Sequence, residues 1–125
     1  MVPASTTSES SSGGDGSVVG AAHDGLGTPY VWGGKDASGW DCSGFASWAY
    51  AQAGKDIPSN TYAMMDSMEQ VSEPSPGDLV IQNGGAHVAI YVGNGQLIGA
   101  NNPGVGTTMY SLDSPYWQTD MFLTA

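Results

Sequence analysis

The stretch Gly39–Gly54, GWDCSGFASWAYAQAG, carries the only cysteine of this 125-residue chain, Cys42. Its apolar residues recur at helical spacing, so one helix face is predicted to pack inward: Phe45, Trp48, Ala49 and Ala53. Asp41 stands where a helix N-cap is expected, and Gly54 stands where a C′ glycine is expected. Cys42 is therefore predicted to lie in the first turn of a helix.

A cysteine at this place has two readings. The free N–H groups and the dipole of a helix N-terminus stabilise a thiolate, and a nucleophilic cysteine also needs a basic partner, usually a histidine. His87 is the candidate partner, because it opens an apolar strand pattern that can pack beside the helix start. From the residues alone, Cys42 can equally be a buried structural thiol, and His87 an exposed histidine at a strand end.

The rest of the chain predicts an α+β fold, with N-terminal helices packed on an antiparallel sheet of about five or six strands. Val18–Leu26 has the apolar spacing of a short helix, and Asn60 or Thr61 is placed to cap another that runs to Met68. Asn94-Gly95 between two apolar runs is a strong hairpin signal. The predicted strands are 79–81, 87–92, 96–100, 107–111 and 121–124.

The N-terminal segment has a different composition. Met1–Gly20 is dominated by Ser, Thr and Gly and offers almost no apolar surface to bury. We therefore expect residues 1–17 to form a flexible linker or tail, and residues 18–125 to form one folded domain.

The charge balance excludes several classes of function. Twelve acidic residues stand against two lysines, Lys35 and Lys55, so no basic face for nucleic acid can be built. Anionic membranes are disfavoured for the same reason, and no apolar run is long enough for membrane insertion. One cysteine and two histidines leave little for a metal site. We expect no cofactor, no metal and a monomeric protein.

Four motifs, read in order, carry a family resemblance: TPYVWGG (28–34), DCSGF (41–45), PGDLV (76–80) and HVAIYVGNG (87–95). Together they resemble the NlpC family of bacterial cell-wall cysteine peptidases, which have a reduced papain-like fold. The resemblance covers residues 18–125 and includes the SPYW segment at 114–117. It implies a secreted or cell-wall-associated enzyme that cleaves peptidoglycan stem peptides, typically between D-γ-glutamyl and a diamino acid.

The resemblance also implies roles for single residues. Cys42 matches the nucleophile, His87 the general base, and Tyr30 a tyrosine whose hydroxyl points into the active site. Asp41 and Ser43 match residues that line the substrate cleft, where an acid can meet a substrate ammonium group. Read from the sequence, Asp41 can also be a plain N-cap, Tyr30 can pack beside Trp32, and Trp40 either lines the cleft or packs in the interior.

One position departs from the family pattern. The third polar residue, which orients the imidazole, is matched by Gly99 in QLIGANN. Asn101 lies two residues on, and a bulge at Gly99 would bring it back toward His87; the alternative is a turn residue before Pro103. Gly99 therefore leaves open a catalytically weakened muropeptide-binding domain. An amidase or acyltransferase with the same Cys–His pair also stays open.

Overall fold

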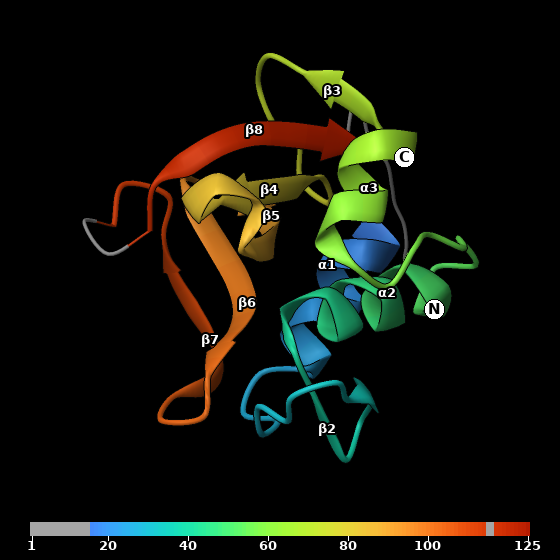
Figure 1. The fold of residues 1–125 in the computed structure, drawn as a ribbon, viewed down its shortest axis with the longest axis vertical. Coiled ribbons are helices and arrows are strands. Elements are labelled where there is room, and N and C mark those ends of the chain that lie inside the picture. Colours follow the sequence, from blue (N-terminus) through green and yellow to red (C-terminus); the bar gives the residue numbers. More distant parts are fainter. Residues whose placement is uncertain (1–15, 115–116) are drawn as a thin grey trace.

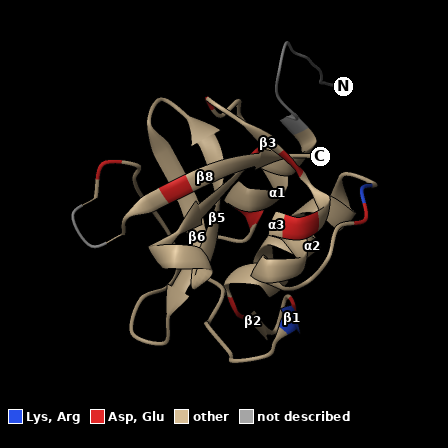
Figure 2. Cartoon of the chain, turned by 45° about the horizontal axis from the view of Figure 1, so that its top comes forward, with Lys and Arg blue, Asp and Glu red and all other residues tan. Residues whose placement is uncertain are grey.

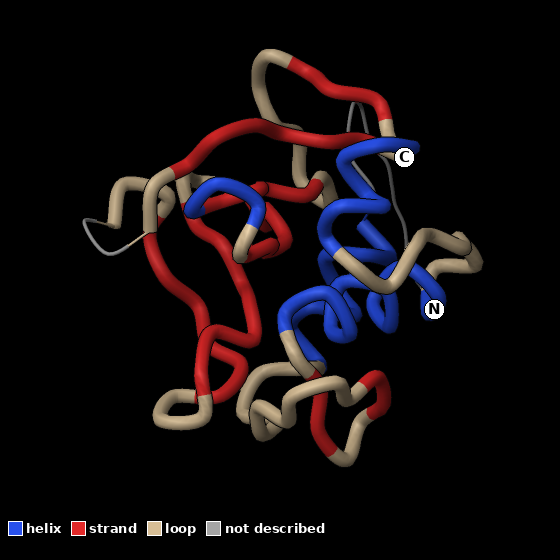
Figure 3. The backbone as a smooth tube through the Cα atoms, viewed as in Figure 1, coloured by secondary structure: helices blue, strands red, loops and turns tan. Residues whose placement is uncertain are grey.

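The structure is a computed structural model that describes residues 16–114 and 117–125. Nearly all of the predicted tail, and Pro115 and Tyr116 of the SPYW segment, lie outside the described residues. Three helices occupy the first half of the described chain: α1 (Gly16–Asp24), α2 (Cys42–Gln52) and α3 (Thr61–Ser67). They gather on one side of the molecule and the main sheet lies on the other (Figures 1 and 3).

The main sheet has six antiparallel strands in the order β3-β8-β4-β5-β6-β7. Their bounds are β3 (Glu69–Val71), β4 (Leu79–Gln82), β5 (His87–Gly93), β6 (Gln96–Asn102), β7 (Gly106–Ser111) and β8 (Thr119–Thr124). A short 3-10 helix, η1 (Asn83–Gly85), joins β4 to β5, and β1 (Lys35–Asp36) pairs with β2 (Gly39–Trp40). The predicted α+β class and strand number are confirmed.

Short-range sequence patterns predicted the helices and strands, but they did not predict the order of the strands in the sheet. The hairpin at Asn94 and Gly95 is confirmed, since both residues have positive φ, 56° and 73°, as a two-residue hairpin turn requires. The strands do not pair simply in chain order, because β8 returns to lie between β3 and β4. Pairing β8 there covers the outer edge of β4, whose residues are all buried.

Apolar residues form two clusters, one on each face of the sheet. The larger cluster joins the helices to side chains such as Leu79, Ile81 and Ile90, all fully buried. The smaller contains Val80, Ala89 and Leu97. Alternation along β4 and β5 explains the division, because successive side chains point to opposite faces. Each large aliphatic side chain in these clusters contributes roughly 1.5–3 kcal/mol by burial.

Acidic residues are spread over several elements, and the two lysines lie apart from each other, on β1 and in the loop after α2 (Figure 2). Within the described residues, no helix is long and apolar enough to cross a membrane.

Candidate active site

Asp41 ties the start of α2 to the preceding loop. Its Oδ1 accepts a hydrogen bond from the Gly44 N–H at 2.7 Å, which confirms the predicted N-cap, and its Oδ2 accepts one from the Gly33 N–H at 3.1 Å. Gly44 has no room for a side chain, because a Cβ there would collide with the Gly34 carbonyl oxygen. The TPYVWGG and DCSGF motifs are thus packed directly against each other.

Cys42 is the first residue of α2 and is half-buried against the start of β5. Its sulfur interacts with the backbone N–H of Val88, the residue after His87. Burial raises the pKa of the Cys42 thiol, and the N–H groups of Val88 and Ser43 offset only a part of this shift. Desolvation thus outweighs the stabilisation that the helix N-terminus gives to a thiolate, and the neutral thiol is favoured.

His87 opens β5 and is only 3% exposed, so the exposed alternative is excluded. The Trp117 ring stacks on the imidazole, with centroids 4.1 Å apart and planes 28° apart. Burial lowers the pKa of His87 to about 4, although the neighbouring Asn101 side chain opposes part of the shift. The imidazole is therefore neutral at neutral pH and free to accept a proton.

Tyr30 also lies near the Cys42 sulfur. The residue is half-buried and forms an isolated bridge with Trp40. Burial first, and then negative charge at Cys42 and Asp41, raises the pKa of Tyr30. The structure thus brings the Tyr30 hydroxyl within electrostatic reach of the sulfur.

Asn101 folds back over Gly99. The register between β6 and β7 shifts between Ala100 and Asn102, so the irregularity lies at Asn101 itself and not at Gly99. A Cβ placed on Gly99 would lie 3.0 Å from Asn101 Oδ1 and 3.3 Å from His87 Nε2. The Asn101 side chain therefore occupies the space beside the imidazole that Gly99 leaves open.

Three further residues contact the histidine or support it, and sequence reasoning missed all of them as site residues. Tyr110 on β7 has its hydroxyl 3.1 Å from His87 Nε2, and it donates to Gln82 Oε1 at 2.7 Å. Gln82 is fully buried at the end of β4. The third is Trp117, of which only the surrounding SPYW pattern was noticed. No local spacing signals Tyr110, because only the order of strands in the sheet brings β7 near His87. Gln82 lies one residue beyond the predicted strand 79–81 and is the register partner of His87 on β5.

Ser43 and Trp40, which were also predicted to line the cleft, are both buried. Ser43 is 8% exposed and its hydroxyl donates to Asp41 Oδ1 at 3.3 Å. Trp40 is fully buried, donates from its ring N–H to Thr107 at 2.7 Å and packs against Phe45 and Trp48. Of the two predictions for Trp40, this burial favours packing in the interior over a place in the substrate cleft.

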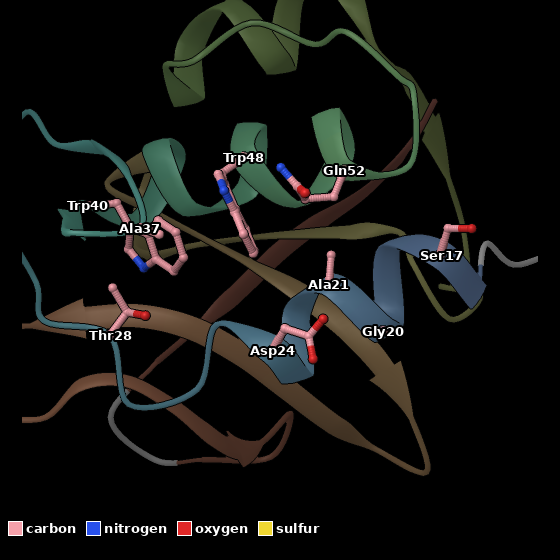
Figure 4. Close-up of a pocket in the computed structure, with 9 residues that line it drawn as sticks. All are labelled: Ser17, Gly20, Ala21, Asp24, Thr28, Ala37, Trp40, Trp48 and Gln52. Carbon is pink, nitrogen blue, oxygen red and sulfur yellow. The ribbon is translucent and has the colours of Figure 1, made fainter.

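A pocket of about 500 Å³ lies between α1 and α2, with Trp48, Gln52 and Asp24 among its lining residues (Figure 4). Cys42 and His87 do not line it, so it is separate from the candidate active site. Among the described residues, no group of three His, Cys, Asp or Glu side chains is arranged to hold a metal ion.

Comparisons with known proteins identify the family of this chain. The sequence profile of the NlpC/P60 family matches residues 27–125. The chain is 45% identical over 93 residues to "Probable endopeptidase p60" of Listeria seeligeri, covering 70% of this chain and 18% of that protein. It is 40% identical over 99 residues to a "Probable endopeptidase" of Corynebacterium glutamicum strain R, covering 77% of this chain and 47% of that protein. The chain thus spans less than half the length of these curated relatives.

Solved structures show the same fold. The NlpC/p60 domain of the peptidoglycan hydrolase SagA superposes with a TM-score of 0.79 at 39% identity, over 88% of this chain and 97% of that chain. RipD of Mycobacterium tuberculosis, titled a non-catalytic NlpC/p60 domain protein, superposes with a TM-score of 0.75 at 20% identity, over 88% and 95%. Fold alone therefore does not establish catalysis, but it agrees with the sequence match. The chain belongs to the NlpC/P60 family.

Proposed function

We propose that this domain is a peptidoglycan endopeptidase, with Cys42 as nucleophile and His87 as general base. The observation that carries the proposal is the position of the Cys42 sulfur: it lies at the N-terminus of α2 and against the N–H of Val88, the residue that follows the buried, neutral His87 on β5. Its NlpC/P60 relatives named endopeptidases, and the hydrolase SagA, support the choice of reaction.

The reaction is an acyl transfer that starts from a neutral pair. As the sulfur attacks the substrate carbonyl, its proton passes to the imidazole, and the protonated imidazole then gives that proton to the leaving amine. Water attacks the resulting thioester with His87 again as base, which frees the acid and restores the thiol. Tyr30, whose hydroxyl lies near the sulfur, is the proposed donor toward the developing oxyanion.

The proposed substrate is a peptidoglycan stem peptide, cleaved between D-γ-glutamyl and a diamino acid. Asp41 and Ser43 are the proposed contacts to the substrate. Asp41 accepts hydrogen bonds from Gly33, Gly44 and Ser43, which still leaves its carboxylate with acceptor capacity for a substrate ammonium group. Such a substrate places the working protein outside the cell or at the cell wall.

Incubation with purified peptidoglycan, followed by mass analysis of the released fragments, tests this proposal. We expect fragments that end in D-γ-glutamyl, together with fragments that begin with the diamino acid. Release of sugar from L-Ala would identify an amidase instead, and products joined to an added amine would identify an acyltransferase. Binding without any release would favour the second candidate, a muropeptide-binding domain, which the missing polar side chain at Gly99 favours.

A further inference from the structure

A line of hydrogen bonds leads away from the His87 ring across the sheet. His87 Nε2 contacts the Tyr110 hydroxyl at 3.1 Å, and that hydroxyl donates to Gln82 Oε1 at 2.7 Å. Gln82 in turn donates from Nε2 to the Thr119 hydroxyl at 3.3 Å. The four side chains come from β5, β7, β4 and β8.

The direction of these bonds fixes the position of the ring proton. A tyrosine hydroxyl has one proton, and here that proton is donated to Gln82. The Tyr110 oxygen can therefore only accept from His87, so the proton of the neutral ring lies on Nε2. The lone pair is then on Nδ1, the ring nitrogen left free to take a proton from the Cys42 thiol.

Two further observations favour the same tautomer. Asn101 Oδ1 is buried beside the ring and has no hydrogen-bond partner among the described residues. It is an acceptor only, and its interaction with the ring raises the pKa of His87 against the larger effect of burial, so it favours a proton on the ring nitrogen that it faces. Burial, and then negative charge at Cys42, raises the pKa of Tyr110 well above its usual range, which keeps its O–H intact.

This arrangement explains why position 99 is a glycine. A side chain at that position would press against both Asn101 Oδ1 and His87 Nε2. Its absence leaves Nε2 accessible to a hydroxyl that arrives from β7, one strand further away than the usual third polar residue. The missing group is thus replaced from another strand.

We propose that Tyr110, held by Gln82, is the positioning residue that keeps His87 in the Nε2–H tautomer and turns Nδ1 toward Cys42. The proposal rests on the proposed function in that it assigns Cys42 and His87 as the reacting pair. When the Cys42 S–H proton moves to Nδ1, the ring becomes an imidazolium and its Nε2–H remains bonded to Tyr110. Transfer of the Nδ1 proton to the leaving amine restores the neutral Nε2–H ring, while Cys42 remains acylated as the thioester until water attacks it.

The tautomer can be read on the resting protein by 15N–1H NMR of the histidine rings, with His23 as internal reference. We expect wild type to show His87 protonated on Nε2. In Tyr110→Phe the Nδ1–H form should appear and kcat should fall about 10- to 100-fold, with KM nearly unchanged. Tyr91→Phe is the matched control, because its hydroxyl contacts the Gly95 N–H on the same sheet and not His87.

A second variant keeps the proposal testable if Tyr110→Phe does not fold. Gln82→Met removes the acceptor of the Tyr110 proton, which that hydroxyl can then donate to Nε2, so the Nδ1–H form should rise while the tyrosine stays in place. Asn101→Ala should keep the Nε2–H form. A wild-type ring protonated on Nδ1, or a folded Tyr110→Phe protein with an unchanged spectrum and unchanged kcat, would overturn the proposal. A spectrum that responds as expected in a protein without hydrolytic activity would support this orientation and refute the proposed function.

Discussion

Cys42→Ala is expected to lower the rate of fragment release from peptidoglycan by on the order of 10⁴- to 10⁶-fold, since removal of a nucleophile removes the covalent route entirely. The fold should survive, because Cys42 is only half-buried and alanine keeps the helix start intact. Initial rates of fragment release, measured by mass analysis for wild type and variant, give the comparison.

The control for this variant is a circular dichroism spectrum and an unfolding midpoint close to those of wild type. Binding of intact stem peptides should also persist, since the loop held by Asp41 is unchanged. Wild-type turnover by a folded Cys42→Ala protein would refute the nucleophile assignment.

His87→Gln is expected to lower kcat/KM by about 10²- to 10⁴-fold, the usual contribution of general acid–base catalysis. Glutamine fills a similar volume against Trp117 but cannot accept the thiol proton. His23→Gln is the matched control, because His23 is the chain's other histidine and lies exposed on α1. Equal losses in the two variants would contradict a specific role for His87.

The pH dependence of wild-type activity should also report the protonation state of His87. Only the neutral imidazole can accept a proton, and burial lowers the pKa of His87 to about 4. Activity should therefore persist as pH falls through 6.5, the ordinary histidine value, and decline only as pH approaches 4. A profile of kcat/KM that falls by half near pH 6.5, in protein that remains folded by circular dichroism, would show that the ring is not desolvated as described.

Much of the site was predictable because the residues that position Cys42 lie close to it in the sequence. The N-cap at Asp41 and the C′ glycine at Gly54 depend on a few adjacent residues, and they placed Cys42 at the first turn of α2. The turn at Asn94-Gly95 likewise followed from short-range rules. His87 was predictable as the start of a strand, although its burial was not.

The remainder depends on distant parts of the chain. Tyr110 lies 28 residues from Gln82 and 23 from His87, and they meet only because β7 and β4 take particular places in the sheet. The effect of burial on the Cys42 thiol was also not predictable, because a helix dipole can be inferred from sequence while the depth of burial cannot. The burial of Trp40 could not be predicted either, because the neighbouring Asp41 does not indicate which way the tryptophan side chain points.

Alkylation of the single cysteine is the sharpest test of Cys42 as the nucleophile. The protein is treated with iodoacetamide for increasing times, the modified fraction is read by intact-protein mass, and each sample is assayed for cleavage of peptidoglycan stem peptides. Loss of activity in direct proportion to modification of Cys42 is the predicted result. Protein that carries the adduct on every molecule and still cleaves at the wild-type rate would rule out Cys42 as the nucleophile.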